Sequence, residues 1–207
     1  MIKVGWRPPG KDCGLCGART CEGFLAAVER GEKRLQECPF YHEGGTADGR
    51  GAAVHTGRDV LGNTYDFLLT PLPGEPSARK VVLPFRPDLV ERWGIDAGDI
   101  VLGRPEGAGC PVQHVLRVID ADPITGLLTT HVVGPAHSRG KECLDVKAYH
   151  IVGFEGMART VLRPPTFGMR QRFLPSACMM ALTHTGVVNL VIGRGEEAQV
   201  RVEDIRL

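Results

Sequence analysis

Beyond residue 51 the chain alternates short runs of apolar residues with glycine, proline and aspartate. Runs of this length, rich in Val, Ile and Thr and bounded by turn formers, are typical of β-strands. Many short strands with few helices predict a closed or nearly closed barrel, because closure removes exposed strand edges. The predicted strands are residues 52–56, 64–70, 81–85, 100–102, 112–119, 127–133, 148–154, 158–162, 187–192 and 199–202.

Two local signals refine this pattern. Residues 122–126 read Asp-Pro-Ile-Thr-Gly between two apolar runs, which predicts a hairpin turn. Residues 87–93 predict a short helix, because Pro87 suits a first helical turn and Gly94 supplies a stop. The segment 87–101 then passes through Gly-Ile and Gly-Asp into an apolar run, and it resembles a segment common in double-psi barrels.

The first 41 residues have a different composition. They contain four of the seven cysteines, whereas residues 42–51 are polar, rich in glycine and without hydrophobic period, as is typical of a linker. We therefore expect a cysteine-containing module at 1–41, a linker at 42–51 and a β-rich barrel-like domain at 52–207. The fold class is α+β, mostly β, with a double-psi-like barrel as one topology for the large domain.

Size and charge narrow the classes of function. A chain of 207 residues with 43% hydrophobic residues can form one ordinary domain plus a small module. With 25 basic and 24 acidic residues the net charge is +1, and no basic run indicates a nucleic acid or an anionic membrane as partner. No apolar run approaches the roughly 20 residues of a spanning helix, and residues 1–10 lack a secretory apolar stretch, so we expect a cytoplasmic protein.

The strongest chemical signal is the spacing of four cysteines near the N-terminus. An iron–sulfur cube needs four thiolates that point inward from a tight loop, and short spacings provide this. Gly14 and Gly17 allow the positive backbone angles that such a loop requires. The predicted ligands form the pattern C-x2-C-x4-C followed, after sixteen intervening residues, by Cys-Pro: Cys13, Cys16, Cys21 and Cys38.

The residues after the third cysteine predict a helix, because apolar side chains recur there at helical spacing. A helix that begins at Cys21 would direct its N-terminal amides toward an anionic cluster. Gly31 is expected to end it, and residues 32–37 to form a further turn that returns the chain to Cys38.

Residues 13–39 resemble the small cluster domain of the corrinoid iron–sulfur protein large subunit and of the B subunit of Rnf-type complexes. The resemblance rests on Cys-Gly-x-Cys-Gly, Thr20-Cys21, Phe24, Gly31-Glu32 and Cys38-Pro39. It implies one low-potential, oxygen-sensitive [4Fe-4S] cluster that passes single electrons to a partner, in an anaerobe's cytoplasm or a protected complex. A zinc site is the alternative for these thiolates, although zinc pairs usually read C-x2-C twice.

Three further cysteines leave two interpretations open. Cys110, which lies four residues before His114, could join Cys143 and Cys178 in a second metal site or act as a redox thiol. The alternative is that Cys110 and Cys178 are small buried side chains and Cys143 a surface thiol.

Three functions follow from these observations. The first is an electron-transfer protein whose partner is a redox enzyme or protein, with no catalytic residues of its own. The second is a reductase whose barrel domain binds its own flavin, pterin or substrate, with the cluster as an internal relay. The third is a zinc-stabilised interaction module without a redox role.

Overall fold

The computed structural model describes residues 8, 16–38, 41, 57–106 and 110–207. The chain divides into two compact units, one formed by residues 1–54 and 133–142 and the other by 55–132 and 143–207. The predicted linker at 42–51 and the predicted strand at 52–56 lie outside the described residues. None of the helices in the described part of the chain combines the length and apolar character needed to cross a bilayer.

The smaller unit contains the helix predicted after the third cysteine, α1 (Cys21–Glu29). The Thr20 hydroxyl accepts a hydrogen bond from the Gly23 amide at 3.0 Å, which satisfies one free donor of the first turn. The helix ends at Glu29 with Arg30 as its C-cap, and the next residue, Gly31, has a positive φ of 75°, which suits a residue without a side chain. A short 3-10 helix, η1 (Leu35–Glu37), supplies the predicted second turn.

The larger unit is a nine-stranded sheet with one short helix, α2 (Asp88–Arg92). The fold is therefore mostly β, as predicted. Two 3-10 helices, η2 (Pro135–His137) and η3 (Gly195–Glu197), lie between strands. The strands are β1 (Phe67–Thr70), β2 (Arg79–Pro84), β3 (Ile100–Pro105), β4 (His114–Ala121), β5 (Leu128–Val133), β6 (Leu144–Arg159), β7 (Arg170–Pro175), β8 (His184–Ile192) and β9 (Gln199–Arg206).

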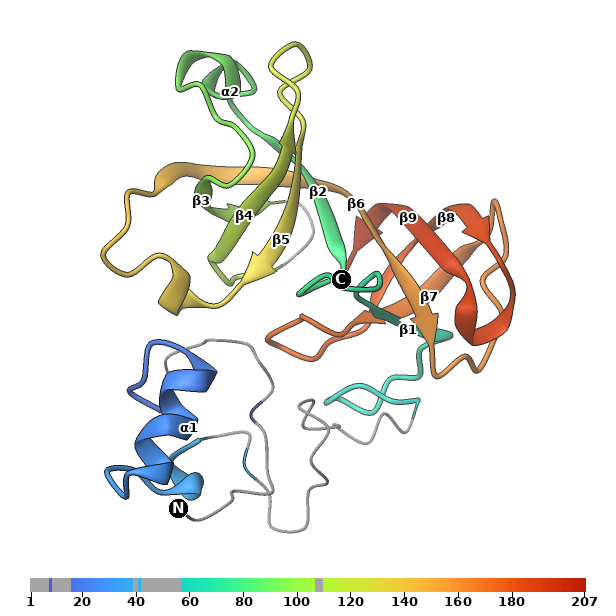
Figure 1. Cartoon of the computed structure of the whole chain (residues 1–207). Helices are drawn as coiled ribbons and strands as arrows, with labels where there is room; N and C mark the ends of the chain where they lie inside the picture. Colours follow the sequence, from blue (N-terminus) through green and yellow to red (C-terminus); the bar gives the residue numbers. More distant parts are fainter. Residues whose placement is uncertain (1–7, 9–15, 39–40, 42–56, 107–109) are drawn as a thin grey trace. The chain divides into compact units, whose positions relative to one another are not determined.

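The sheet closes on itself twice because β6 is shared. The strand order is β1-β7-β8-β9-β6-β2-β5-β4-β3, with additional β1–β6 and β6–β3 pairings. The first part of β6 therefore closes a barrel with β2, β3, β4 and β5, and its last part closes another with β1, β7, β8 and β9. We call these the first and the second barrel, and Figure 1 shows β6 passing from one to the other.

Each barrel has its own apolar core. In the second barrel Phe173 packs between Phe67 and Phe154, with ring centroids 6.0 and 5.9 Å apart. In the first barrel α2 contributes Val90 to the core, where it is almost fully buried. The main buried residues of the first core are Val82, Val90, Ile95, Val101, Leu116, Val118, Leu128, Val146 and Tyr149. Those of the second are Phe67, Leu69, Ala78, Phe154, Ala158, Phe173, Val188, Ala198, Val200, Val202 and Ile205.

The local predictions in the first barrel are confirmed. At the hairpin between β4 and β5, the Asp122 carboxylate accepts hydrogen bonds from the Ile124 amide at 2.9 Å and the Thr125 hydroxyl at 2.6 Å. Helix α2 leads through Gly98, at φ 99°, into β3. The predicted helix and the strand that follows it are thus both present, whereas the double closure on β6 is a feature that the sequence did not predict.

The strand predictions differ from the structure in two places. Residues 148–154 lie within β6 as predicted, but this strand continues through Gly156, where the backbone of β1 lies against it, and of the predicted strand 158–162 only residues 158 and 159 belong to it. The strand β7 was missed because Arg170 and Arg172 give it a polar appearance, although Phe173 and Leu174 are buried.

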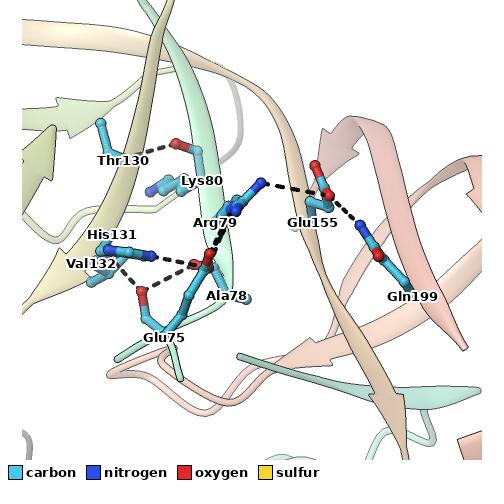
Figure 2. A network of polar contacts seen from close by, with 10 residues as sticks. Glu75, Ala78, Arg79, Lys80, Thr130, His131, Val132, Glu155 and Gln199 are labelled. Carbon is cyan, nitrogen blue, oxygen red and sulfur yellow. Dashed lines mark hydrogen bonds and ion pairs between the residues drawn. The ribbon is translucent and has the colours of Figure 1, made fainter. Parts of the chain in front are cut away.

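A polar network connects the two barrels at the middle of β6 (Figure 2). Arg79 on β2 forms a two-pronged ion pair with Glu75, with its closest contact at 2.6 Å, and lies 3.9 Å from Glu155 on β6. The Gln199 amide of β9 donates to Glu155 at 2.6 Å, and His131 Nε2 lies 3.1 Å from Glu75. Side chains of both barrels thus meet across β6.

Gly156→Ala should weaken closure of the second barrel. The added methyl group would overlap the carbonyl oxygen of Thr70, so β1 must move away from β6. We expect a loss of about 3 kcal/mol or more in the free energy of unfolding, measured by urea denaturation. Gly74→Ala, in a turn with open space around the added atom, is the control and should cost about 1–2 kcal/mol through its positive φ alone. An equal or smaller loss for Gly156→Ala would contradict this account.

Glu75→Gln should change how stability depends on pH. Burial acts to raise the pKa of Glu75, but hydrogen bonds from Arg79 and His131 outweigh it and hold the pKa below its ordinary value of 4.5. The ionised carboxylate therefore stabilises the fold above about pH 4.5, and this contribution is lost as the pH falls through the lowered pKa. The variant should be about 1–3 kcal/mol less stable at neutral pH and show a flatter loss of stability in acid. Thermal unfolding from pH 7 to pH 3 measures both, with exposed Glu91→Gln as the control that should match the wild type.

Candidate metal centre

Three of the four predicted cluster ligands lie in the described part of the small unit. Cys16 directly precedes the bend at Gly17, Cys21 is the first residue of α1, and Cys38 directly follows η1. Cys13 lies outside the described residues. The cysteines are thus placed at a turn, a helix start and a helix end, where the chain changes direction.

A small apolar cluster brings two of these cysteines to the same place. Phe24 is fully buried, and the Cys38 side chain beside it is 6% exposed. Cys16 and Tyr41 pack against the same cluster, as do Ala18, Leu25, Val28 and Leu35. Cys21 lies one helical turn before Phe24 on α1. Cys16 and Cys38, far apart in sequence, therefore meet around a phenylalanine carried by the helix that begins at Cys21.

Charged side chains hold the turn that leads to Cys38. Lys33 Nζ lies 3.2 Å from a Glu37 carboxylate oxygen, and the other oxygen of Glu37 accepts a hydrogen bond from the Arg34 amide at 3.0 Å. The Lys33 ammonium also lies beside Gly17, because a Cβ atom at Gly17 would be 3.3 Å from it. Gly17 has a positive φ of 77°, which a residue without a side chain adopts readily, and its missing side chain also leaves room for the Lys33 ammonium.

The donor chemistry of this module fits an iron–sulfur group. Its candidate ligands are soft sulfur donors, and thiolates are the ligands that such clusters use. The positive end of the α1 dipole and the Lys33 ammonium both favour an anion nearby. Among the residues described, no group of three or more His, Cys, Asp or Glu side chains is arranged to hold a single metal ion.

The three remaining cysteines are all partly buried. Cys110 Sγ lies 4.0 Å from His114 Nε2, which is a weak contact to a ring nitrogen. Because the metal-ligating groups in the described ranges form no set of three, Cys110, Cys143 and Cys178 do not gather into the second metal site that was one of the two interpretations.

A second group of polar side chains lies inside the barrel unit and was missed from the sequence. Lys80 on β2 is 1% exposed, and its Nζ lies 2.8 Å from His114 Nδ1 and 2.9 Å from Tyr149 Oη. The same His114 nitrogen lies 2.7 Å from Tyr149 Oη, so the three polar groups form a triangle. Alternation along the strand could have revealed this group. Lys80 and Val82 are two residues apart in β2 and therefore lie on the same face, and Val82 is fully buried.

Burial dominates the proton equilibria of this group. It lowers the pKa of Lys80 to about 7, while the thiols of Cys110 and Cys178 act in the opposite direction. Burial, helped by the charge of Lys80, lowers the pKa of His114 to about 3. Burial also raises the pKa of Tyr149. Near neutral pH the tyrosine and the imidazole are therefore neutral, and the lysine is divided between its two forms.

Comparison with known proteins agrees with the candidate site. The family model described as "Putative Fe-S cluster" matches residues 9–40, which identifies this stretch as an iron–sulfur cluster segment and covers Cys13, Cys16, Cys21 and Cys38. No solved structure matches the chain. The uncharacterized protein MJ0119 of Methanocaldococcus jannaschii is 32% identical over 215 residues, which span 96% of this chain and 89% of that protein. This chain is thus a member of the same protein family as MJ0119, with an N-terminal iron–sulfur segment.

Proposed function

We propose that Cys13, Cys16, Cys21 and Cys38 bind one [4Fe-4S] cluster, and that the protein passes single low-potential electrons to or from a partner redox enzyme. The observation that carries this proposal is the convergence of Cys16 and Cys38 on Phe24, next to the helix that begins at Cys21. A cube held by four thiolates requires such convergence of distant cysteines.

The helix and the charged side chains of the module support a redox role. Reduction adds one negative charge to a cluster that is already anionic with its thiolates. The positive end of the α1 dipole and the ammonium of Lys33 beside Gly17 would both stabilise that added charge. The resemblance to the cluster domains of corrinoid iron–sulfur and Rnf proteins supports the [4Fe-4S] type and the low potential.

In this proposal the two barrels form a rigid scaffold to which the partner protein binds. Electron tunnelling depends on distance, so the protein's task is to hold the cluster near the acceptor rather than to supply reactive side chains. The expected setting is an anaerobic cytoplasm, because a low-potential cluster of this kind is sensitive to oxygen.

A reductase that binds its own organic cofactor or substrate is the second candidate. A cavity of about 390 Å³ beside β1 and β7 favours it, since this volume suits a small ligand. Three arginines, Arg163, Arg170 and Arg172, line the cavity together with Tyr65 and Asp66. A flavin or pterin that stays bound after removal of the cluster would support this candidate over simple electron transfer.

Anaerobically purified protein should contain about four irons and four sulfides per chain and give an EPR signal when reduced. Cys21→Ala should lose or degrade the cluster because a ligand is removed, whereas Cys143→Ala, which lies outside the matched segment, should keep the full content. Iron and sulfide analysis with EPR checks both. One zinc and no iron in the wild type, or equal loss in both variants, would contradict the assignment.

Lys33→Met should make the reduction potential more negative. Removing a positive charge beside Gly17 withdraws stabilisation from the reduced cluster, and we expect a shift on the order of tens of millivolts. Arg34→Met is the matched control, because its side chain is 85% exposed and its charge is screened by solvent. Redox titration followed by EPR measures the difference. A positive shift, or the same shift in both variants, would show that Lys33 does not act on the cluster.

A further inference from the structure

The group formed by Lys80, His114 and Tyr149 extends to Cys110, which is partly exposed. Lys80 is buried, His114 and Cys110 are each partly buried, and Cys110 Sγ faces the outer nitrogen of the imidazole at 4.0 Å. Because Nδ1 of the same ring contacts Lys80 Nζ at 2.8 Å, the imidazole stands between a thiol and an amine. All four residues belong to the larger unit, so this arrangement does not depend on the cluster module.

From this geometry we propose that Cys110 is the nucleophilic thiol of a second site, activated by proton transfer through His114 to Lys80, and that it reacts with disulfides of small thiols. The proposal is independent of the iron–sulfur cluster.

The proton transfer balances without any other participant. In the starting state Cys110 is a thiol, His114 carries its proton on Nδ1, and Lys80 is a neutral amine. The thiol proton passes to Nε2 of the imidazole while the Nδ1 proton passes to Lys80 Nζ. The products are a thiolate, the other neutral tautomer of His114 and an ammonium ion, with no change in total charge.

The environment of each group suits its part in this transfer. The lowered pKa of Lys80, about 7, makes the neutral amine available near neutral pH. Because the pKa of His114 is lowered to about 3, the ring passes a proton on rather than keeping it. Tyr149 keeps its own proton and supplies a polar contact to both nitrogens.

The ammonium formed on Lys80 is stabilised by its surroundings. Its nitrogen lies 5.0 Å from the ring centroid of Tyr149 and 5.6 Å from that of Phe154, which are cation–π distances. A thiolate at Cys110 or at Cys178 attracts the ammonium, and this attraction acts to raise the pKa of Lys80. His184 is the further titratable group that interacts with Lys80, and burial lowers its pKa to about 4, so it is neutral and leaves the ammonium unopposed.

Gly103 on β3 makes room for this group. A Cβ atom there would lie 2.8 Å from a ring carbon of Tyr149 and 3.1 Å from Val146, so the tyrosine ring packs flush against bare backbone. The chain thus fixes the tyrosine whose hydroxyl orients both Lys80 and His114.

A disulfide suits the site because a thiolate is a soft nucleophile that attacks disulfide sulfur readily. Cys110 sulfur bonds to one sulfur of the substrate, the substrate S–S bond breaks, and the other sulfur leaves as a thiolate. The leaving thiolate takes the proton held on Lys80, returned through His114. The products are a mixed disulfide on Cys110 and one free thiol: the Cys110 sulfur is oxidised, and the substrate disulfide, which is the oxidant, is reduced at its leaving sulfur.

The test uses the full-length holoprotein under anaerobic conditions with 4,4′-dithiodipyridine as the probe. Mass spectrometry of peptides after quenching gives the rate of modification at Cys110 itself. At about pH 7.5, Cys110 in the protein should react at least about 10-fold faster than in a synthetic peptide of residues 105–116. A rate equal to or below that of the peptide would overturn the proposal.

Two variants locate the cause of the activation. Lys80→Met removes the proton acceptor and His114→Asn interrupts the transfer, so each should lower the Cys110 rate by about 10-fold. Lys147→Met, which removes an 82% exposed lysine from β6, is the matched control and should leave the rate unchanged. Thermal unfolding verifies that each variant is folded. Wild-type rates in both folded variants would overturn the proposal. If neither variant folds, the proposal stands or falls on whether Cys110 reacts faster in the wild-type protein than in the peptide.

Discussion

The barrel unit depends on β6 being hydrogen-bonded along both of its edges over two successive parts. Its first part pairs with β2 and β3, and its last part with β1 and β9. Backbone hydrogen bonds thereby close two small cores that have almost no buried residue in common. Each core is small, and small cores bury too little apolar area to be very stable alone, so the continuous strand joins two weak units into a stronger one.

Alternation of apolar and polar residues was sufficient to predict most strands, since nearly all have one face in a core. It failed where backbone contacts rather than side chains determine the strand. In the sequence Gly156 interrupts an apolar run, which suggested the end of a strand. In the structure β6 continues through Gly156, because the backbone of β1 packs so closely there that only a residue without a side chain fits. In β7 the pattern failed for a different reason, because Gln171 is polar and yet buried. Its side chain accepts a hydrogen bond from the Thr166 amide and donates one to the Pro164 carbonyl oxygen, so its burial leaves no polar group unsatisfied.

The two chemical sites differ in how far local sequence reveals them. The cysteine spacing near the N-terminus predicts an iron–sulfur segment, because its ligands lie within a short stretch and the family match covers that same stretch. Lys80, His114 and Tyr149 come from three strands, β2, β4 and β6, and meet only when the first barrel closes. No spacing rule connects residues 34 and 69 positions apart, so their proximity is a property of the topology.

The shared strand also bears on how such a protein can arise by recombination. A cut before β6 takes β6 from the first barrel and separates β1 from the rest of the second, and a cut after β6 leaves β7, β8 and β9 without β1 and β6. Neither barrel can therefore be exchanged between genes without opening the other.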